Sequence, residues 1–350
     1  MQVDYLVVGL GLAGIALCEQ LHSHNKSFVV IDQTQLSAST VASGLYNPIV
    51  LKRFVPAWKG HELMQRSLPY YKKLEKKLKT SFIHSTSILR RFTAPAELND
   101  WQLACSSLGM ASYMDPLLKT NTNTAIDTPF GYGMLHGTGW VDCSLLLSAY
   151  RSHLLSSSQL REDLFEYDRL NTSDHKLGYD DITAHKIVFT EGIGMIKNPW
   201  FSYLPLKRTK GELLVIYCPD LNESNILHSG IFIIPLGNNH YKVGATYNNH
   251  DKTTLPTNEG RSLLETRLKK ILKAPYTVVD HMAGLRPTTP DRRPLVGLHP
   301  KDKRMSVING LGSRGVLHAP YTARSLVEHI EYGRALDPEI NVFRYESSAL

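Results

Sequence analysis

The stretch that decides the fold is Tyr5-Leu6-Val7-Val8-Gly9-Leu10-Gly11-Leu12-Ala13-Gly14, near the amino terminus. Its first four residues form a short apolar and β-branched run, which is typical of a strand buried on both faces. Three glycines follow in the spacing Gly-x-Gly-x-x-Gly, and an apolar pattern with helical spacing continues through Leu21. A strand, a glycine turn and a helix in this order predict the first unit of a dinucleotide-binding α/β fold.

The three glycines have separate physical tasks in such a unit. Gly9 permits the tight turn, Gly11 lets backbone N–H groups approach a pyrophosphate, and Gly14 allows the helix to pack closely on the strand. The amino terminus of the helix, at Leu12 and Ala13, adds positive potential for the phosphates. We therefore expect this turn to hold the pyrophosphate of a dinucleotide.

A second buried run, residues 28–31, ends at Asp32, which lies 18 residues beyond Gly14. Its carboxylate is placed to accept hydrogen bonds from a ribose diol. An acid at this position disfavours NADP, because it is a poor neighbour for a 2′-phosphate. NAD and FAD share this unit, so the rest of the chain must decide between them.

Composition limits the class of protein. The chain has 350 residues, 42% hydrophobic and 20% charged, which predicts about two globular domains with a sizeable core. The net charge of +7 is compatible with an anionic ligand or a nucleic acid but demands neither. The four cysteines lie far apart without zinc spacing, so neither a disulfide scaffold nor a metal site is expected. The apolar run after Asp4 lacks a basic flank and breaks at Glu19, so we expect a soluble, cytoplasmic protein with no signal peptide and no membrane contact.

Short segments in the rest of the chain bear on the cofactor. They are residues 42–48 (ASGLYNP), 139–142 (GWVD), 191–192 (EG), 210–212 (KGE), 284–287 (GLRP) and 307–315 (VINGLGSRG). Their order and spacing, tied to the glycine turn, resemble the FAD-dependent D-amino-acid oxidase and glycine oxidase superfamily over essentially the whole chain. Residues 310–315, followed by Ala319 and Pro320, are most similar to one branch. That branch is the flavin domain of the bifunctional enzyme that completes the methylaminomethyl modification of tRNA wobble uridine.

The resemblance implies an α/β fold with a Rossmann-type FAD-binding domain, which carries the GxGxxG turn, and a second, discontinuous α+β substrate domain that contains an antiparallel sheet. The implied FAD-binding domain takes residues 1–60, 140–205 and 284–350, and the substrate-binding domain takes residues 61–139 and 206–283.

Local patterns add individual strands to this outline. Strand-like runs at residues 213–217, 231–235 and 241–246 predict the antiparallel sheet, with Asn238-Asn239 as a hairpin turn between the last two. Two further strands are expected, one at residues 185–190 and a short one around residues 164–165.

Non-covalent FAD is the implied cofactor, and the resemblance and the glycine turn together imply its contacts. These are Gly9, Gly11, Leu12, Ala13, Gly14, Asp32, Ser43, Gly44, Asn47, Phe165, Gly192, Gly284, Gly312, Ser313, Arg314, Gly315 and Val316. Backbone N–H groups of residues 313–316, with Arg314, are expected to face the negative charge of the reduced flavin near N1 and the C2 carbonyl. The alternative for this loop is an ordinary glycine turn before a helix.

The implied chemistry is oxidation of a C–N bond. In this superfamily hydride passes from the carbon that bears the amine to flavin N5, and the imine that results hydrolyses. The protein binds and orients the substrate and the flavin and tunes the electronic properties of the flavin. Arg286 matches the position of the carboxylate-binding arginine of the superfamily, and a guanidinium can hold a carboxylate in bidentate fashion. The alternative for Arg286 is a structural salt bridge with a residue such as Asp291.

One position departs from the superfamily pattern. Where the oxidases of D-amino acids and glycine carry a tyrosine, this chain has Phe232, which keeps the ring but loses the hydroxyl that holds the carboxylate. Tyr241 or Tyr247 could supply that hydroxyl, and the change also admits a larger or differently held amine. Arg286, Phe232 and Arg314 are thus the candidate catalytic residues, and a small amine or amino acid is the expected substrate.

Three other readings stay open. A stand-alone tRNA wobble-uridine oxidase that removes a carboxymethyl group is less favoured, although the lysine-rich residues 72–79 could contact RNA phosphates. Those lysines are otherwise the solvated face of an exposed helix. A flavoprotein subunit without turnover and an NAD-linked dehydrogenase are the remaining alternatives. The 15 histidines are scattered without a metal-ligand pattern, so no metal is expected.

Overall fold

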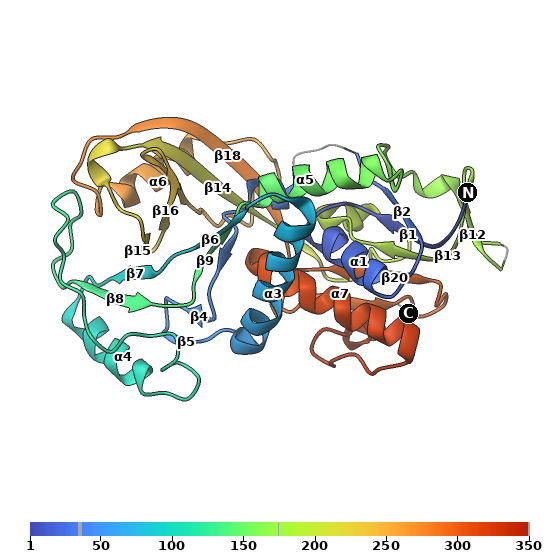
Figure 1. Ribbon diagram of the computed structural model, residues 1–350, viewed down its shortest axis with the longest axis horizontal. Helices are drawn as coiled ribbons and strands as arrows, with labels where there is room; N and C mark the ends of the chain where they lie inside the picture. Colours follow the sequence, from blue (N-terminus) through green and yellow to red (C-terminus); the bar gives the residue numbers. More distant parts are fainter. Residues whose placement is uncertain (34–36, 174, 349–350) are drawn as a thin grey trace.

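The structure is a computed structural model that describes residues 1–33, 37–173 and 175–348. Figure 1 shows an elongated molecule with a sheet in each half, and both termini lie in the half that contains β1. We call this half the first lobe and the half that contains α6 (Asn258–Leu268) the second lobe. Helix α3 (Gly60–Leu78) stands between the lobes, and the long strands β14 (Lys207–Tyr217) and β18 (Thr277–Thr288) run from one toward the other.

The first lobe is built on an eight-stranded sheet in the order β10-β2-β1-β13-β12-β11, with β20 beside β13 and β19 beside β20. Five of its strands, β10, β2, β1, β13 and β20, form a continuous parallel set. The strands are β1 (Gln2–Val8), β2 (Phe28–Ile31), β10 (Leu160–Arg161), β11 (Leu170–Asn171), β12 (Leu177–Tyr179), β13 (Ile182–Phe189), β19 (Leu295–Leu298) and β20 (Met305–Asn309).

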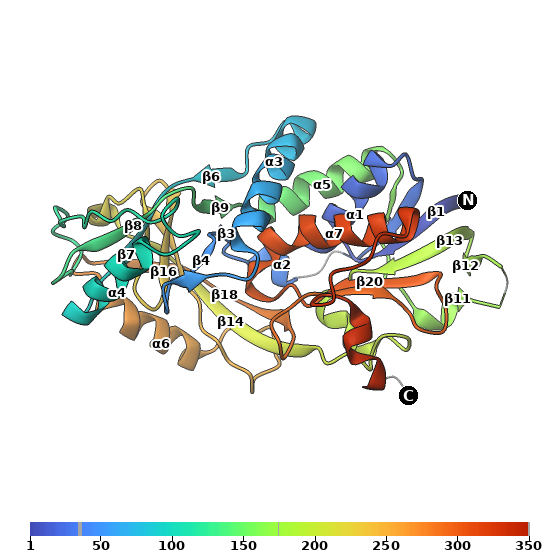
Figure 2. The ribbon, with the colours of Figure 1, turned by 90° about the horizontal axis from the view of Figure 1, so that it is seen from below.

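Helices cover one face of this sheet. They are α1 (Leu12–Ser23), α5 (Cys143–Ser156), α7 (Gly315–Tyr332) and α3, and Figure 2 shows them together on the same side of β13 and β20. Tyr5 and Val7 of β1 pack into this helical layer, whereas Leu6 and Val8 pack on the opposite face with Phe189. Burial on both faces explains why β1 reads as a continuous apolar run.

The second lobe contains a seven-stranded sheet in the order β18-β14-β17-β16-β15-β7-β8. All of its neighbouring pairs are antiparallel except β15 with β7. Its other strands are β7 (Ile88–Arg91), β8 (Tyr132–Leu135), β15 (Ile226–His228), β16 (Phe232–Gly237) and β17 (His240–Gly244). Helix α6 packs against it through Leu264 and Leu268, which share a buried cluster with Leu214 and Val243.

The remaining elements are short. The helical ones are α2 (Ala38–Val41), α4 (Pro95–Cys105), η1 (Tyr167–Arg169), η2 (Gly192–Lys197), η3 (Pro219–Leu221), η4 (Gly312–Arg314) and η5 (Val342–Ser348). The short strands are β3 (Leu45–Tyr46), β4 (Ile49–Val50), β5 (Val55–Pro56), β6 (Ile83–Ser85) and β9 (Gly139–Val141).

Most of the strands expected from local pattern are present. Strands β14, β16 and β17 form the predicted antiparallel set, and β13 contains residues 185–189 of the run predicted at residues 185–190. Asn238 and Asn239 both adopt positive φ, 49° and 60°, as a two-residue hairpin turn with right-handed twist requires.

The strand predicted around residues 164–165 is wrong. The strand in this part of the chain is β10, at Leu160–Arg161, which pairs in parallel with Val30 and Ile31 at the end of β2. Residues 164–165 lie beyond the end of β2 and have no partner strand. Phe165 is buried because its ring stacks on Tyr179, with ring centroids 4.5 Å apart. Its apolar character therefore reflects packing and not a strand.

We propose that the domain division stated above describes the two lobes. Strands β1, β2, β10, β13, β19 and β20 fall within residues 1–60, 140–205 and 284–350, and strands β7, β8 and β14–β17 fall within residues 61–139 and 206–283. Strand β18 spans the proposed boundary at residue 284 and pairs with β14 along most of its length. This shared strand ties the two parts of the chain together.

The described residues contain neither a membrane-spanning helix nor a cluster of metal ligands. Within residues 1–33, 37–173 and 175–348, no helix is both long and apolar enough to cross a membrane. In the same part of the chain, no three His, Cys, Asp or Glu side chains gather as a metal site would require.

The close approach of α1 to β1 makes a first prediction about stability. A Cβ at position 14 would lie 2.2 Å from the carbonyl oxygen of Gly9, so Gly14→Ala must push the helix from the strand. We expect a loss of about 1–3 kcal/mol in the free energy of unfolding, measured by urea titration. Gly178→Ala is the matched control, because a Cβ there would meet only ordinary contacts. Equal stability of the two variants would contradict this packing.

Candidate functional site

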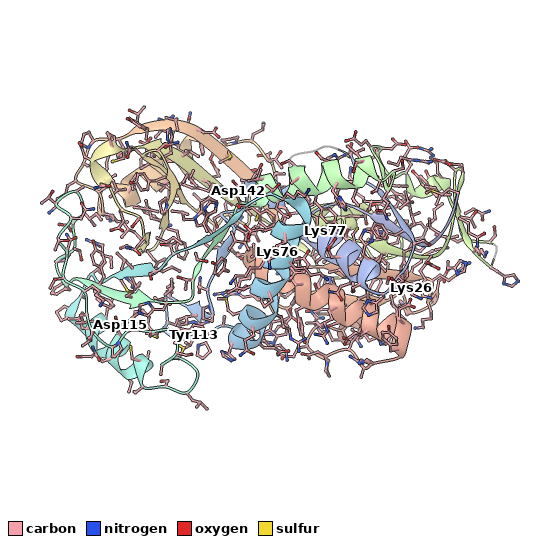
Figure 3. All side chains as sticks on the ribbon, in the orientation of Figure 1. Lys26, Lys76, Lys77, Tyr113, Asp115 and Asp142 are labelled. Atoms are coloured by element: carbon pink, nitrogen blue, oxygen red, sulfur yellow. The ribbon has the colours of Figure 1, made fainter. Side chains whose placement is uncertain are left out.

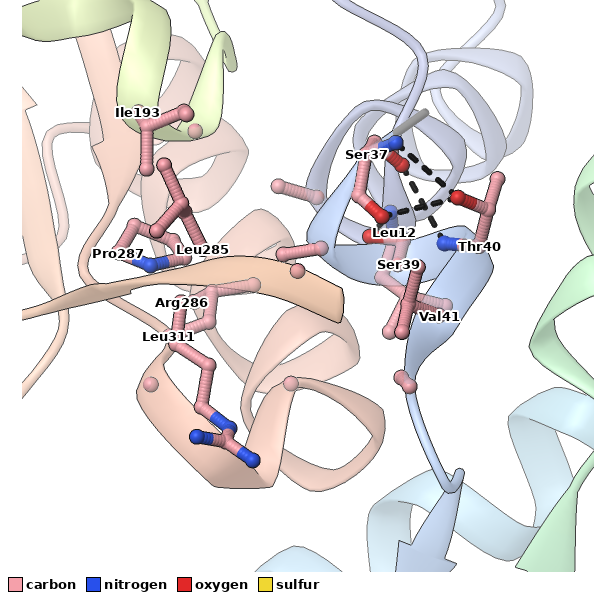
Figure 4. Close-up of a pocket in the computed structure, with 18 of the residues that line it drawn as sticks. Leu12, Ser37, Ser39, Thr40, Val41, Ile193, Leu285, Arg286, Pro287 and Leu311 are labelled. Atoms are coloured by element: carbon pink, nitrogen blue, oxygen red, sulfur yellow. Dashed lines mark hydrogen bonds between the residues drawn. The ribbon is translucent and has the colours of Figure 1, made fainter. Parts of the chain in front are cut away.

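A cavity of about 1570 Å³ is lined by residues from both lobes. Every residue predicted to contact FAD or substrate lines it except Gly14, which lies behind the glycine turn. Figure 4 shows part of this wall: Leu12 and Ser39 come from one side, and Leu285 and Arg286 from the other. The cavity therefore brings together segments that are far apart in the sequence.

The glycine turn forms one end of the wall. Gly9 adopts a positive φ of 96°, and a Cβ there would lie 2.8 Å from the carbonyl oxygen of Thr190. Gly11 precedes the first turn of α1, and no side chain caps that helix in the usual way. The Leu12 N–H donates to Ser39 Oγ over 3.3 Å. The amino end of α1 is thus turned toward the cavity, where its dipole favours an anion.

Asp32 stands at the end of β2, as predicted. Its Oδ1 accepts a hydrogen bond from the Leu10 N–H at 2.9 Å, and its Oδ2 pairs with Nη1 of Arg151 at 2.6 Å. Arg151 comes from α5 and also pairs with Glu162. Sequence reasoning missed Arg151, because nothing in the pattern of its helix indicates that α5 passes over the end of β2.

A short helix next to the glycine turn was also missed. In α2 the Ser37 side chain accepts from the Thr40 N–H, and the Thr40 side chain accepts from the Ser37 N–H, so the two residues form a capping box. Together with Ser39 they line the cavity and present hydroxyl groups close to the first turn of α1 (Figure 4). The Ser-x-x-Thr spacing after β2 was the available signal, since it marks a helix start.

The segment after β13 supplies a buried acid. Glu191 accepts hydrogen bonds from the Tyr167 hydroxyl at 2.6 Å and from Asn198 Nδ2 at 2.8 Å. Burial raises the pKa of the Glu191 carboxyl above its usual range. The adjacent Gly192 has a positive φ of 55° and lines the cavity with Phe165.

The loop of residues 42–48 forms a second wall. Gly44 has a positive φ of 71°, and a Cβ there would lie 1.9 Å from the carbonyl oxygen of Val141. Ser43 and Asn47 line the cavity beside it. Gly284 of β18 faces Val41, whose Cβ would lie 3.2 Å from an added methyl group.

The predicted loop of residues 310–316 forms a turn that leads into α7. Gly310 and Gly312 adopt positive φ of 69° and 58°, and Ser313, Gly315 and Val316 line the cavity. Arg314 does so too, but its guanidinium donates to the carbonyl oxygens of Asn47 at 2.7 Å and Ile49 at 3.0 Å. It therefore ties this loop to the preceding wall.

Arg314 also carries an uncompensated charge. No carboxylate in the described ranges lies within ion-pair distance of it, and burial lowers the pKa of its guanidinium to about 10. A cation held on the wall by neutral carbonyl groups keeps its attraction for an anion in the cavity.

Arg286 projects from β18 at the second-lobe side. Its guanidinium fits against Gly211, where an added Cβ would lie 2.1 Å from Nη2. Its single hydrogen bond within the described chain runs from Nη1 to the Thr246 carbonyl oxygen over 3.3 Å. Burial lowers the pKa of Arg286. The salt bridge considered with Asp291 is absent, because Asp291 pairs instead with Arg344 at 2.9 Å.

Apolar side chains surround this cation. Phe232 and Leu213 line the cavity near β14, and the ring of His228 lies 4.5 Å from that of Phe232. Burial, with the nearby Arg90, lowers the pKa of His228 to about 3, so this imidazole is neutral at physiological pH. Among the lining residues between 208 and 287, this end of the cavity offers arginine side chains and no acid.

The residues present fit FAD. Gly9 and Gly11 line the cavity at the α1 amino terminus, a Cβ at Gly11 would crowd Ser39 Oγ at 3.1 Å, and Asp32 stands at one end. The loops of residues 42–48 and 310–316 lie farther along the same cavity, whose size suits an extended dinucleotide.

The chain belongs to the FAD dependent oxidoreductase family (DAO), whose model matches residues 4–329. It is therefore an oxidoreductase with FAD as its cofactor, and its mixed α/β architecture is the one that this family adopts.

Individual proteins that are similar to this chain include glycine oxidases and a tRNA-modification enzyme. Glycine oxidases of Bacillus subtilis and Pseudomonas putida are each 25% identical; the first match covers 62% of this chain and 63% of that protein, and the second covers 91% and 92%. The tRNA 5-methylaminomethyl-2-thiouridine biosynthesis bifunctional protein MnmC of Marinobacter nauticus is 22% identical over 93% of this chain. The match spans about half of that longer protein, 55%. The crystal structure of glycine oxidase from Geobacillus kaustophilus shares the fold, with a TM-score of 0.80 at 18% identity over 96% of each chain.

Asp32 gives a prediction for cofactor affinity. Asp32→Asn removes the charge that accepts from Leu10 and is expected to receive the ribose hydroxyls, so the Kd for FAD should rise about 10- to 100-fold. Titration of the apoprotein with FAD, followed by flavin fluorescence, measures this. Asp100→Asn is the control, because Asp100 does not line the cavity. An unchanged Kd for Asp32→Asn would remove Asp32 from the cofactor site.

Proposed function

We propose that this protein uses FAD to oxidise the C–N bond of a small amine or amino acid that carries a carboxylate, and that the imine product then hydrolyses. The observation that carries the proposal is Arg286, a guanidinium in the cavity wall without an acidic partner among the described residues. Desolvating a cation is costly unless an anion compensates it, so such a position is built for an anionic ligand.

The surroundings of Arg286 favour a carboxylate that is held by shape as well as by charge. Gly211 leaves room for the planar guanidinium beside β14, so its edge stays available for two parallel hydrogen bonds. Phe232 and Leu213 add apolar walls and exclude water, which strengthens the ion pair. In the described chain, the lining residues between 208 and 287 include two arginines and no acid, so an amine without a carboxylate gains nothing at this end.

Other residues of the cavity wall stabilise negative charge near the cofactor and orient the substrate. FAD supplies the two-electron acceptor for the hydride that leaves the substrate carbon. Arg314 and the N–H groups at the start of α7 provide positive potential on one wall of the cavity. Arg286 fixes the substrate carboxylate and so sets which carbon is presented.

The four widely spaced thiols suit a reducing location, and we propose that the protein acts in the cytoplasm. All four cysteines are free and buried, which agrees with a chain that does not depend on disulfides.

Anaerobic bleaching of the flavin tests the proposed reaction. The holoprotein is mixed with glycine, sarcosine, D-alanine or D-proline, and the flavin absorbance at about 450 nm is followed. We expect at least one of these carboxylated amines to bleach the flavin, and the corresponding amine without a carboxylate to fail. A yellow protein that no amine bleaches would contradict the proposal and favour a subunit without turnover.

Arg286 is tested by a conservative change. Arg286→Lys keeps a cation but loses the bidentate geometry, so KM for the best carboxylated amine should rise about 10- to 100-fold. Flavin content should be unchanged, because Arg286 belongs to the substrate end. Arg261→Lys, at an exposed position on α6, is the control. If Arg286→Lys leaves KM unchanged, Arg286 does not bind the substrate carboxylate.

A second candidate is a stand-alone tRNA wobble-uridine oxidase, which the match to MnmC favours. Helix α3 is present, and Lys72, Lys73 and Lys76 lie on its exposed face, where Figure 3 labels Lys76 and Lys77. However, Lys77 pairs with Glu19 at 2.5 Å, which leaves less positive charge for RNA. Bleaching by hypomodified tRNA alone, weakened steeply by salt, would establish this second function in place of the first.

A further inference from the structure

His228 places a polar ring in an apolar part of the cavity wall. It is the last residue of β15, it is only 9% exposed, and it lines the cavity. Its ring contacts that of Phe232, which packs against the buried cluster that contains Ile49 and Leu51. Ile49 and Leu51 line the cavity as well. A ligand that reaches this wall therefore meets apolar surface and one imidazole.

The sheet separates His228 from Arg286. His228 stands opposite Phe232 in the pairing of β15 with β16, and Phe232 stands opposite Gly244 of β17. Arg286 belongs to β18, at the edge of the same sheet, and β14, β17 and β16 lie between β18 and β15. Neighbouring strands are about 4.8 Å apart, so the backbones of β18 and β15 are separated by roughly 19 Å. A carboxylate bound to Arg286 leaves His228 free for another group of the ligand.

Two buried nitrogen atoms at this place lack hydrogen-bond partners. Nδ1 of His228 and Nε of Arg90 are both shielded from solvent, and neither has a partner within the described chain. Arg90 stands directly opposite His228 in the pairing of β15 with β7 (Figure 1). The other two nitrogens of the guanidinium donate to the Arg91 carbonyl oxygen and to Glu97. The unpaired N–H of Arg90 thus neighbours the ring of His228.

The cation of Arg90 decides which nitrogen of His228 carries the proton. A guanidinium is always a donor, so it favours a ring nitrogen beside it that offers a lone pair. Burial and Arg90 lower the pKa of His228 to about 3, so the neutral ring holds one proton. With Nδ1 buried beside Arg90, that proton is favoured on Nε2. Nε2 is not shielded from solvent in the same way, and it is the ring nitrogen left to face the cavity.

We propose that His228 forms a second ligand-binding subsite, in which its Nε2–H donates to a carbonyl oxygen on the part of the substrate remote from the reacting carbon. This inference rests on the proposed function and deepens it, because it names a second recognition group on the substrate. Ile49, Leu51 and Phe232 supply apolar surface for the spacer between the two groups. The subsite thus selects substrates that carry an acceptor at the end of an apolar arm.

Matched carboxylic acids test the hydrogen bond. Straight-chain acids of six to eight carbons with a ketone next to the terminal methyl group are each compared with the alkanoate of the same length. Their Kd values for the holoprotein are measured from the perturbation of the flavin spectrum. At least one oxo acid should bind about 3- to 10-fold more tightly than its alkanoate, because it gains one hydrogen bond between neutral groups.

Substitutions at His228 assign that preference. His228→Phe should abolish it, because the ring remains but the donor is lost. His228→Gln should retain most of it, because the amide of glutamine keeps an N–H donor. His136→Phe, at an exposed histidine outside the cavity, is the matched control and should leave the preference unchanged. The subsite is overturned if no oxo acid binds more tightly than its alkanoate, or if His228→Phe keeps the preference.

Arg286→Lys, in the same titrations, separates this inference from the proposed function. It should weaken an oxo acid and its alkanoate by the same factor. If it does so while the oxo acids show no preference, only the His228 subsite fails. If it leaves every Kd unchanged, the proposed carboxylate site fails.

The proton position has a measurement of its own. Nitrogen NMR of the protein with isotope-labelled histidine, with the His228 signals identified by their loss in His228→Phe, should show the proton on Nε2 at neutral pH. A proton on Nδ1 would overturn the inference, because Nε2 would then be an acceptor and could not donate to a carbonyl oxygen.

Discussion

The placement of two guanidinium groups in one cavity without acidic partners is the constraint on which the site depends. In the part of the chain that the structure describes, Arg314 donates hydrogen bonds to two backbone carbonyl oxygens, and Arg286 donates to only one, over 3.3 Å. Burial lowers the pKa of both, which is the signature of a charge that has lost water and gained no counter-ion. The desolvation of a buried guanidinium is offset when an anionic ligand pairs with it, and FAD and an anionic substrate can pair with these two groups.

The fold makes this arrangement by joining two sheets through one long ladder. Strands β14 and β18 pair from Lys207 with Thr288 to Tyr217 with Thr277, and so carry Arg286 from the second lobe to the edge of the first. Gly211 on β14 leaves the space that the guanidinium fills. The glycine turn and α1 meet this edge from the opposite side. Because each wall belongs to a different sheet, the cavity is a property of their junction.

The sequence predicts a structural feature well when residues close together in the chain determine it. The glycine turn, Asp32 and the Asn238-Asn239 hairpin were readable because each is fixed by a few neighbouring residues with special backbone needs. The family resemblance singled out Arg286 and residues 310–316; Arg286 and residues 311–316 line the cavity, and their roles stay predictions. Arg151, in contrast, reaches Asp32 from 119 positions away, and nothing in its own helix shows this.

Side-chain direction was the other limit. The sequence predicts that Arg314 faces the flavin, which stays a prediction, but it does not show that the guanidinium donates to the carbonyl groups of Asn47 and Ile49. Phe165 looked like part of a strand because a buried aromatic ring and a buried strand share the same apolar pattern. Both cases depend on partners that are distant in the chain, which a pattern in one sequence does not contain.

A crystal structure of the FAD-loaded protein with bound glycolate tests the central claim most directly. The account predicts the glycolate carboxylate at about 2.7–2.9 Å from the guanidinium nitrogens of Arg286, as in a charge-assisted bidentate pair. A carboxylate bound elsewhere, with Arg286 paired to a side chain of the protein, would contradict it.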